Sequence, residues 1–325
     1  MQMGGGWILV WLLLGISAVG ALAEPAVSGA EVLPERVSTF KIKTRSELNK
    51  EIPFYLRVPK NYQPGKPHRL LFLCPHVNGL GLDKLANSEQ WLALADERDW
   101  FILSCTFMQA LDAVYDRKLS YYYPEGFSGK AVLEALEKVA GKFSVDTERI
   151  LLQGASGGAQ FVHRFARWAP ERVTAVAVNS SSWFDPPDEK SKWLGWLITI
   201  GDSDPSYNES LAMVDKLRLA GAAPLFRSYV GIGHEGTWDA ERLGMAFLEF
   251  YDVQTRKNLG KKRDILTPDK ERLSLREERM PYVGDTQDWK FLANTPEARE
   301  SIPEDSRVFI PNKAIAEKWG TQEGE

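Results

Sequence analysis

Short apolar runs alternate with segments of helical periodicity over most of the chain. Several of these runs are apolar at every position, which is typical of parallel strands that are buried on both faces. The pattern predicts strands at Val37–Lys43, Phe54–Val58, Leu70–Cys74, Phe101–Cys105, Ile150–Gln153, Thr174–Val178, Leu197–Ile200 and Leu225–Val230.

The segments between these strands predict helices at Ser88–Asp96, Ser128–Phe143, Gly158–Trp168, Ser206–Ala220 and Asp239–Tyr251. In the second of them, Val132, Leu136 and Val139 recur at helical spacing, and Ser128 is the expected N-cap. Strands that alternate with helices indicate an α/β fold with a mainly parallel sheet covered by helices.

An uninterrupted apolar segment, Trp7–Leu14, lies near the start of the chain, and apolar residues continue to Ala23. It predicts a secretory signal peptide over residues 1–23, with cleavage after Ala23 and a secreted or periplasmic mature protein. No Lys or Arg precedes the apolar segment, so an uncleaved membrane anchor is the alternative, although the segment is short for a membrane span.

The composition changes after Val253. Residues 254–325 hold 14 basic and 14 acidic residues, so their formal charge is zero. Large apolar side chains recur between these charges, at Trp289, Phe291, Leu292, Val308, Phe309, Ile310 and Trp319. We expect this C-terminal extension to be ordered and to pack on the main domain rather than to form a domain of its own.

Overall charge and cysteine content narrow the classes of function. The 325 residues include 40 Lys and Arg against 44 Asp and Glu, which gives no general electrostatic reason to expect nucleic-acid binding. The two cysteines, Cys74 and Cys105, have no closely spaced Cys or His partner, so we expect no metal site and no cofactor. Two states stay open for them: a disulfide, if neighbouring strands carry them, or two buried free thiols.

The most specific local signal is G-A-S-G-G at residues 154–158, a G-x-S-x-G sequence between a predicted strand and a predicted helix. A serine at such a sharp turn is held in a strained conformation that exposes its hydroxyl, so small residues must flank it. Gly154 and Gly158 meet that requirement, and Ser156 is the candidate nucleophile. A nucleotide-binding turn is disfavoured, because neither the P-loop lysine pattern nor G-x-G-x-x-G is present.

A serine hydroxyl needs a base to take its proton. Of the four histidines, His234 follows the last predicted strand in the loop G-I-G-H-E, where it can approach the serine. Two carboxylates follow the strand Leu197–Ile200, and Asp204 is favoured over Asp202 because it fits a G-x-x-D loop. The alternative interpretation is that Asp202 and Asp204 only form the turn after this strand. The order Ser156, Asp204, His234 agrees with that of the α/β-hydrolase triad and differs from those of chymotrypsin and subtilisin.

Two donors are expected to bind the oxyanion that forms during acyl transfer. One is the backbone N–H of Gly157. The other lies in the loop after Leu70–Cys74, where His76 precedes a Gly-containing stretch similar to the H-G motif of esterases. Val77 replaces the usual glycine of that motif, which leaves the N–H groups of Val77 and Asn78 as alternatives.

With these motifs, residues 36–253 resemble the α/β-hydrolase superfamily, in particular secreted serine esterases of the polyhydroxybutyrate-depolymerase and feruloyl-esterase type. The resemblance implies a mostly parallel eight-stranded sheet with Ser156, Asp204 and His234 converging at its C-terminal edge. We expect residues 24–253 to form this α/β-hydrolase domain. A large lid domain is not expected, because the connection between the sixth and seventh predicted strands is short. No role follows for the C-terminal extension.

The expected activity is hydrolysis of carboxylic esters through an acyl-enzyme on Ser156, with small-molecule or polymer-derived esters as substrates. His76, Tyr123, Trp183 and Trp238 are expected to line the pocket, since aromatic side chains provide apolar walls and stacking surfaces. Two alternatives stay open: a prolyl-oligopeptidase-like serine peptidase, and a catalytically silent hydrolase fold used for binding. The presence of all three triad candidates disfavours the silent fold.

Overall fold

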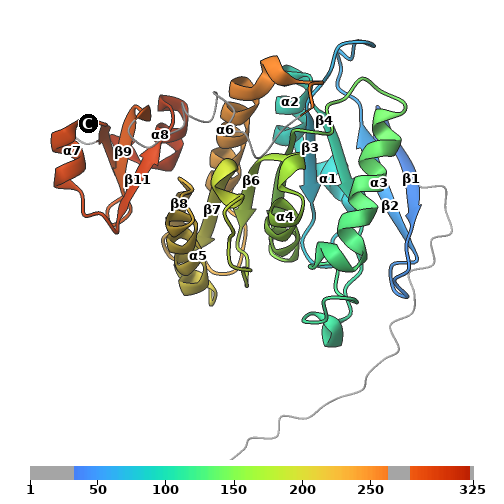
Figure 1. The fold of residues 1–325 in the computed structure, drawn as a ribbon, viewed down its shortest axis with the longest axis horizontal. Coiled ribbons are helices and arrows are strands. Elements are labelled where there is room, and N and C mark those ends of the chain that lie inside the picture. Colours follow the sequence, from blue (N-terminus) through green and yellow to red (C-terminus); the bar gives the residue numbers. More distant parts are fainter. Residues whose placement is uncertain (1–32, 263–278, 323–325) are drawn as a thin grey trace, which may run out of the picture. The chain divides into compact units, whose positions relative to one another are not determined.

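The computed structural model describes residues 33–262 and 279–322, whose arrangement is drawn in Figure 1. The predicted signal peptide, with its cleavage site after Ala23, lies outside the described residues. Within the described part of the chain, no helix is long and apolar enough to cross a membrane.

Eight strands form the central sheet. They are β1 (Val37–Lys43), β2 (Glu51–Arg57), β3 (Leu70–Cys74), β4 (Phe101–Cys105), β5 (Ile150–Ala155), β6 (Val173–Asn179), β7 (Gly195–Gly201) and β8 (Leu225–Tyr229). Their order is β1-β2-β4-β3-β5-β6-β7-β8. β2 pairs antiparallel with β1 and β4, and the other neighbouring pairs are parallel. The predicted mostly parallel eight-stranded sheet is confirmed.

β1, β3 and β4 have their predicted bounds, and the other strands differ at their ends. The largest difference is at β2, which begins at Glu51 rather than Phe54. Pro53 lies inside this strand and has no N–H to donate, which hides the start of the strand in the sequence. Its carbonyl still accepts a hydrogen bond from the Thr106 N–H (3.1 Å).

Helices cover both faces of the sheet (Figure 1). α1 (Gly81–Asn87), α2 (Glu89–Arg98) and α6 (Trp238–Thr255) pack on one face, and α3 (Gly129–Ala140), α4 (Gly157–Trp168) and α5 (Tyr207–Leu219) on the other. Successive side chains of a strand enter opposite layers, so Leu71 and Leu73 pack with the first set and Phe72 with the second. This two-sided burial explains the continuous apolar runs.

The sequence pattern missed α1, and the N-cap predicted at Ser128 is wrong. α1 begins at Gly81, where a Cβ would lie 2.6 Å from the Cys105 backbone, so a glycine stands where a capping or apolar residue would signal a helix. Ser128 has helical angles (φ −67°, ψ −40°), and its hydroxyl donates to the Tyr121 carbonyl (2.8 Å). A π-type turn, Pro124–Ser128, leads directly into α3.

A buried ion pair joins the residue before β3 to α6. Arg69 Nε donates to one oxygen of Asp252 (2.8 Å), and both side chains are fully buried. The other carboxylate oxygen accepts from Trp100 Nε1 (2.8 Å), and Arg69 also donates to Thr255 Oγ1 (2.6 Å). A buried charge without a partner is strongly destabilising, so this cluster fixes where α6 lies on the sheet.

Residues 282–322 form a second, four-stranded sheet with two helices. Its elements are β9 (Tyr282–Asp285), β10 (Lys290–Ala293), α7 (Pro296–Ser301), β11 (Arg307–Ile310), α8 (Lys313–Trp319) and β12 (Thr321–Gln322). The strand order is β11-β9-β10-β12. Apolar side chains of this C-terminal segment, including Phe291 and Val308, belong to the same buried cluster as those of α6.

The C-terminal segment covers β8, the edge strand of the central sheet. The indole N–H of Trp319 donates to the carbonyl of Phe226 (2.6 Å). Arg218 of α5 donates to the carbonyls of Arg307 (2.7 Å) and Asp305 (3.1 Å). An uncovered edge strand offers unpaired backbone groups to other chains, so these contacts protect the sheet from edge-to-edge association.

Cys74 and Cys105 end the neighbouring strands β3 and β4, and both are buried free thiols. Burial raises the pKa of each thiol well above its ordinary value. The thiolate is the reactive form, so both cysteines are protected in the folded protein.

We therefore expect iodoacetamide to leave the folded protein unmodified and to alkylate both cysteines after unfolding in guanidinium chloride. Intact-mass measurement before and after unfolding checks this. Rapid alkylation of the folded protein would contradict the burial. Lack of alkylation after unfolding without reductant would instead reveal a disulfide.

Candidate active site

The candidate nucleophile lies at a strained turn between β5 and α4. Ser156 has φ 53° and ψ −119°, a conformation that residues other than glycine rarely adopt. Its N–H donates to the carbonyl of Asn179 at the end of β6 (3.0 Å), which ties the turn to the neighbouring strand. The serine is half-buried at the C-terminal end of its strand.

Glycines on both sides of the serine allow the main chains to touch. A Cβ on Gly154 would lie 2.4 Å from the carbonyl oxygen of Gly158, and a Cβ on Gly158 would lie 2.3 Å from that of Pro75. Neither position accepts a side chain unless the backbone moves. The G-x-S-x-G spacing is therefore a packing requirement of this strand-to-helix turn.

Three side chains from three connecting segments form a continuous hydrogen-bonded chain. Ser156 Oγ lies 2.9 Å from His234 Nε2, and His234 Nδ1 lies 2.8 Å from Asp204 Oδ2. The Asp204 side chain, after β7, is 1% exposed, whereas that of His234, between β8 and α6, is 39% exposed. A buried carboxylate beside Nδ1 favours the tautomer in which Nε2 can accept the serine proton.

Asp202 holds the histidine loop and does not contact the histidine. Its Oδ1 accepts hydrogen bonds from the Gly231 N–H (2.8 Å) and the Ser203 hydroxyl (3.1 Å). Gly231 begins the loop that leads to His234 and has a φ of 72°, which favours glycine. Of the two carboxylates that the sequence offers, Asp204 is the one that the structure brings to His234.

Two backbone N–H groups lie close together beside the serine. Gly157 is the first residue of α4, and the point where its Cβ would stand is 3.0 Å from the Val77 nitrogen. Among the described residues, none accepts the Val77 N–H. The Asn78 side chain is bonded to the Gln109 backbone, accepting from its N–H (2.7 Å) and donating to its carbonyl (3.4 Å). Of the two candidate amide nitrogens, that of Val77 is among the three atoms nearest the Cβ position of Gly157, and that of Asn78 is not.

Tyr121 and Tyr122 adjoin the turn at Ser156, whereas the sequence singled out only their neighbour Tyr123 for the pocket. The Tyr121 hydroxyl lies 2.6 Å, and Tyr122 Cε1 3.0 Å, from the point where a Cβ on Gly157 would stand. Both rings are buried, and they meet edge to face with 4.7 Å between their centres. The run of three tyrosines that begins at Tyr121 was the one signal in the sequence.

Trp183 and Trp238, which were expected to line the pocket, are 45% and 46% exposed. Trp183 meets Tyr115 edge to face, with 5.2 Å between ring centres. These residues belong to a set of exposed apolar side chains in the segments that follow β3, β4, β6 and β8, at the sheet edge of Ser156. This apolar rim consists of Leu80, Met108, Leu111, Tyr115, Leu119, Trp183, Val230 and Trp238.

The other two expected pocket residues have different surroundings. His76 is exposed after β3, and its Nδ1 lies 3.0 Å from the Val77 carbonyl oxygen. Tyr123 is buried, with the guanidinium groups of Arg117 and Arg164 4.8 Å and 4.5 Å from its ring centre. Tyr123 therefore belongs to an arginine–aromatic cluster, and His76 stands beside the proposed oxyanion loop.

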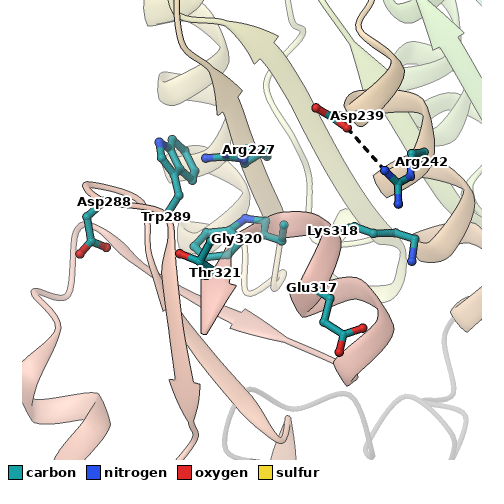
Figure 2. A pocket seen from close by; sticks show the side chains of 10 residues that line it. Arg227, Asp239, Arg242, Asp288, Trp289, Glu317, Lys318, Gly320 and Thr321 are labelled. Atoms are coloured by element: carbon teal, nitrogen blue, oxygen red, sulfur yellow. Dashed lines mark ion pairs between the residues drawn. The ribbon is translucent and has the colours of Figure 1, made fainter. Parts of the chain in front are cut away.

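A separate hollow of about 390 Å³ lies between β8, the start of α6 and the C-terminal segment (Figure 2). On one wall, the Arg227 guanidinium lies 4.1 Å from the centre of a Trp289 ring, and Arg242 and Lys318 line the same hollow. Its lining includes no serine, cysteine or histidine, so it is distinct from the candidate active site.

No protein-family model and no curated protein matches this chain. It is similar to the solved structure of a ferulic acid esterase, with 17% identity, a TM-score of 0.51, and coverage of 68% of this chain and 97% of the other. It is also similar to a thermostable esterase, with 20% identity, a TM-score of 0.53, and coverage of 69% of this chain and 62% of the other. A third similar structure is that of a fluorophosphonate-binding serine hydrolase from Staphylococcus aureus. Its identity is 14% and its TM-score 0.51, and the match covers 66% of this chain and 98% of the other. These likenesses show that the chain has an α/β-hydrolase fold, as found in esterase structures.

Proposed function

We propose that the protein is a serine hydrolase that cleaves carboxylic esters through an acyl-enzyme on Ser156. The observation that carries this proposal is the unbroken hydrogen-bonded chain from Asp204 through His234 to Ser156. The strained conformation of the serine costs on the order of 1–3 kcal/mol, and such strain is found where function requires it.

In the first half-reaction, His234 Nε2 takes the Ser156 proton as Oγ attacks the carbonyl carbon of the ester. The tetrahedral intermediate collapses when the imidazolium gives that proton to the leaving alcohol, which leaves the acyl group on Oγ. In the second half-reaction, the same nitrogen takes a proton from a water molecule whose oxygen attacks the acyl carbon. The imidazolium then returns that proton to Ser156 Oγ as the acid is released, which restores the serine. Asp204 holds the imidazole tautomer and stabilises its charged form in both halves.

The negative charge of each tetrahedral intermediate forms on the former carbonyl oxygen. The backbone N–H groups of Gly157 and Val77 are the proposed donors to this oxygen. Gly157 also begins α4, whose N-terminus adds the positive end of the helix dipole. Removing one donor of this kind typically costs about 2.7–4 kcal/mol of transition-state stabilisation.

The apolar rim supports esters with apolar or aromatic acyl groups as substrates, since exposed apolar side chains favour contact with an apolar acyl group. The similar solved structures include a ferulic acid esterase, and the acyl group of ferulic acid is aromatic. Secretion is part of the proposal and is supported by the apolar segment Trp7–Leu14.

A fluorophosphonate probe should form a single adduct on Ser156, since the probe reacts with a serine that a base activates. The wild-type protein should also hydrolyse short p-nitrophenyl esters. Ser156→Ala should lose both reactions and keep its melting temperature, whereas Ser203→Ala, which removes a nearby hydroxyl outside the triad, should keep both. Intact mass, peptide mapping and ester turnover check these outcomes.

Ester turnover that persists in Ser156→Ala would remove this serine from the mechanism. A folded wild-type protein without adduct or turnover would favour a silent fold used for binding. Cleavage of peptides without cleavage of esters would favour the serine peptidase.

Two asparagine variants separate the acid of the triad from the residue that holds the histidine loop. Asp204→Asn should lower kcat by about 10⁴-fold, because the amide favours the wrong tautomer of His234. Asp202→Asn keeps an oxygen that can accept the Gly231 N–H, so kcat should fall less than about tenfold. Ester turnover by both purified variants tests this, and small, equal losses would exclude both residues as the acid.

A further inference from the structure

An unpartnered tyrosine hydroxyl lies beside the two proposed oxyanion donors. Tyr121 is 1% exposed, and its hydroxyl is shielded from solvent and makes no hydrogen bond with any described residue. This hydroxyl is 2.6 Å, and the Val77 nitrogen 3.0 Å, from the point where a Cβ on Gly157 would stand. Three polar groups therefore meet around one small volume next to Ser156.

A buried hydroxyl without a partner destabilises the folded protein, because it loses its hydrogen bonds to water and gains none in return. Phenylalanine would fill the same space without that cost. Burial also raises the pKa of Tyr121 well above its ordinary value, so the phenol keeps its proton. A protonated and unpaired donor at this place suits an acceptor that appears only during the reaction.

Hydrogen bonds connect the segment that carries Tyr121 to the loop that carries Val77. The buried Ser120, directly before Tyr121, donates to the Gln109 side chain (2.7 Å). The Gln109 N–H in turn donates to the Asn78 side chain (2.7 Å), one residue after Val77. The tyrosine and the backbone amide are therefore positioned by the same network.

We propose that the Tyr121 hydroxyl is a third oxyanion donor, which bonds the charged oxygen of the tetrahedral intermediates together with the Gly157 and Val77 amides. This inference rests on the proposed ester hydrolysis. The proposed role of Tyr121 accounts for the absence of a side chain at residue 157, because even a methyl group there would clash with the tyrosine hydroxyl. Hydrogen bonds of an unliganded site tighten in the transition state, so the hydroxyl meets its acceptor when charge develops.

Tyr121→Phe removes the hydroxyl and keeps the ring, which stacks on Phe107 with 4.9 Å between centres. We expect kcat for a p-nitrophenyl ester to fall about 10²-fold with little change in KM. A trifluoromethyl ketone, which forms a tetrahedral adduct with the serine, should bind more weakly by a similar factor. The melting temperature should stay unchanged or rise, because an unpaired buried hydroxyl is removed.

Tyr229→Phe is the matched control. The Tyr229 hydroxyl is also shielded and unpaired, but it lies at the end of β8, where its ring faces Arg227. This variant should show the same effect on melting temperature and keep the wild-type kcat.

A wild-type kcat in Tyr121→Phe would overturn the role of this tyrosine and leave the ester hydrolysis intact. A loss of kcat together with a lower melting temperature and unchanged affinity for the ketone would also overturn it, since those changes indicate a structural role. A wild-type protein without adduct or turnover would overturn the proposed function itself, and the tyrosine role with it.

Discussion

The proposed active site depends on one steric constraint, the close approach of the main chain on either side of Ser156. With no side chain at Gly154 or Gly158, α4 packs directly on the end of β5 and on the loop after β3. The serine between these two glycines has a strained backbone, with a φ of 53°. Packing of the surrounding sheet and helices offsets that strain, so Ser156 cannot be moved without disturbing the centre of the fold.

The position of His234, the proposed base, depends on a second close approach. A Cβ on Gly201, the last residue of β7, would lie 2.0 Å from the carbonyl oxygen of Ile232 in the histidine loop. The same carbonyl accepts a hydrogen bond from the Ser203 N–H (3.0 Å). The strand end that carries Asp204 therefore also fixes the loop of His234, so the proposed acid and base are positioned as one unit. Such preorganisation is what a hydrogen-bonded triad requires.

Features encoded in short stretches of sequence were predictable, and those that depend on distant packing were not. The turn around Ser156 has a local steric signature, and the ends of parallel strands meet at one edge, which allowed Asp204 and His234 to be identified. Tyr121 reaches Gly157 only through the path of an irregular segment between β4 and α3. The strands of the C-terminal sheet have four residues or fewer, too short to show an alternating pattern.

The ion pair between Arg69 and Asp252 ties the middle of the sheet to a helix that comes late in the chain. Its partners are 183 positions apart, so a nascent chain that ends before α6 contains the guanidinium without the carboxylate. Arg69 directly precedes β3, which lies between β4 and β5 in the middle of the sheet. A chain that ended before α6 would therefore bury this guanidinium without its carboxylate, and contacts between residues so far apart in sequence slow folding.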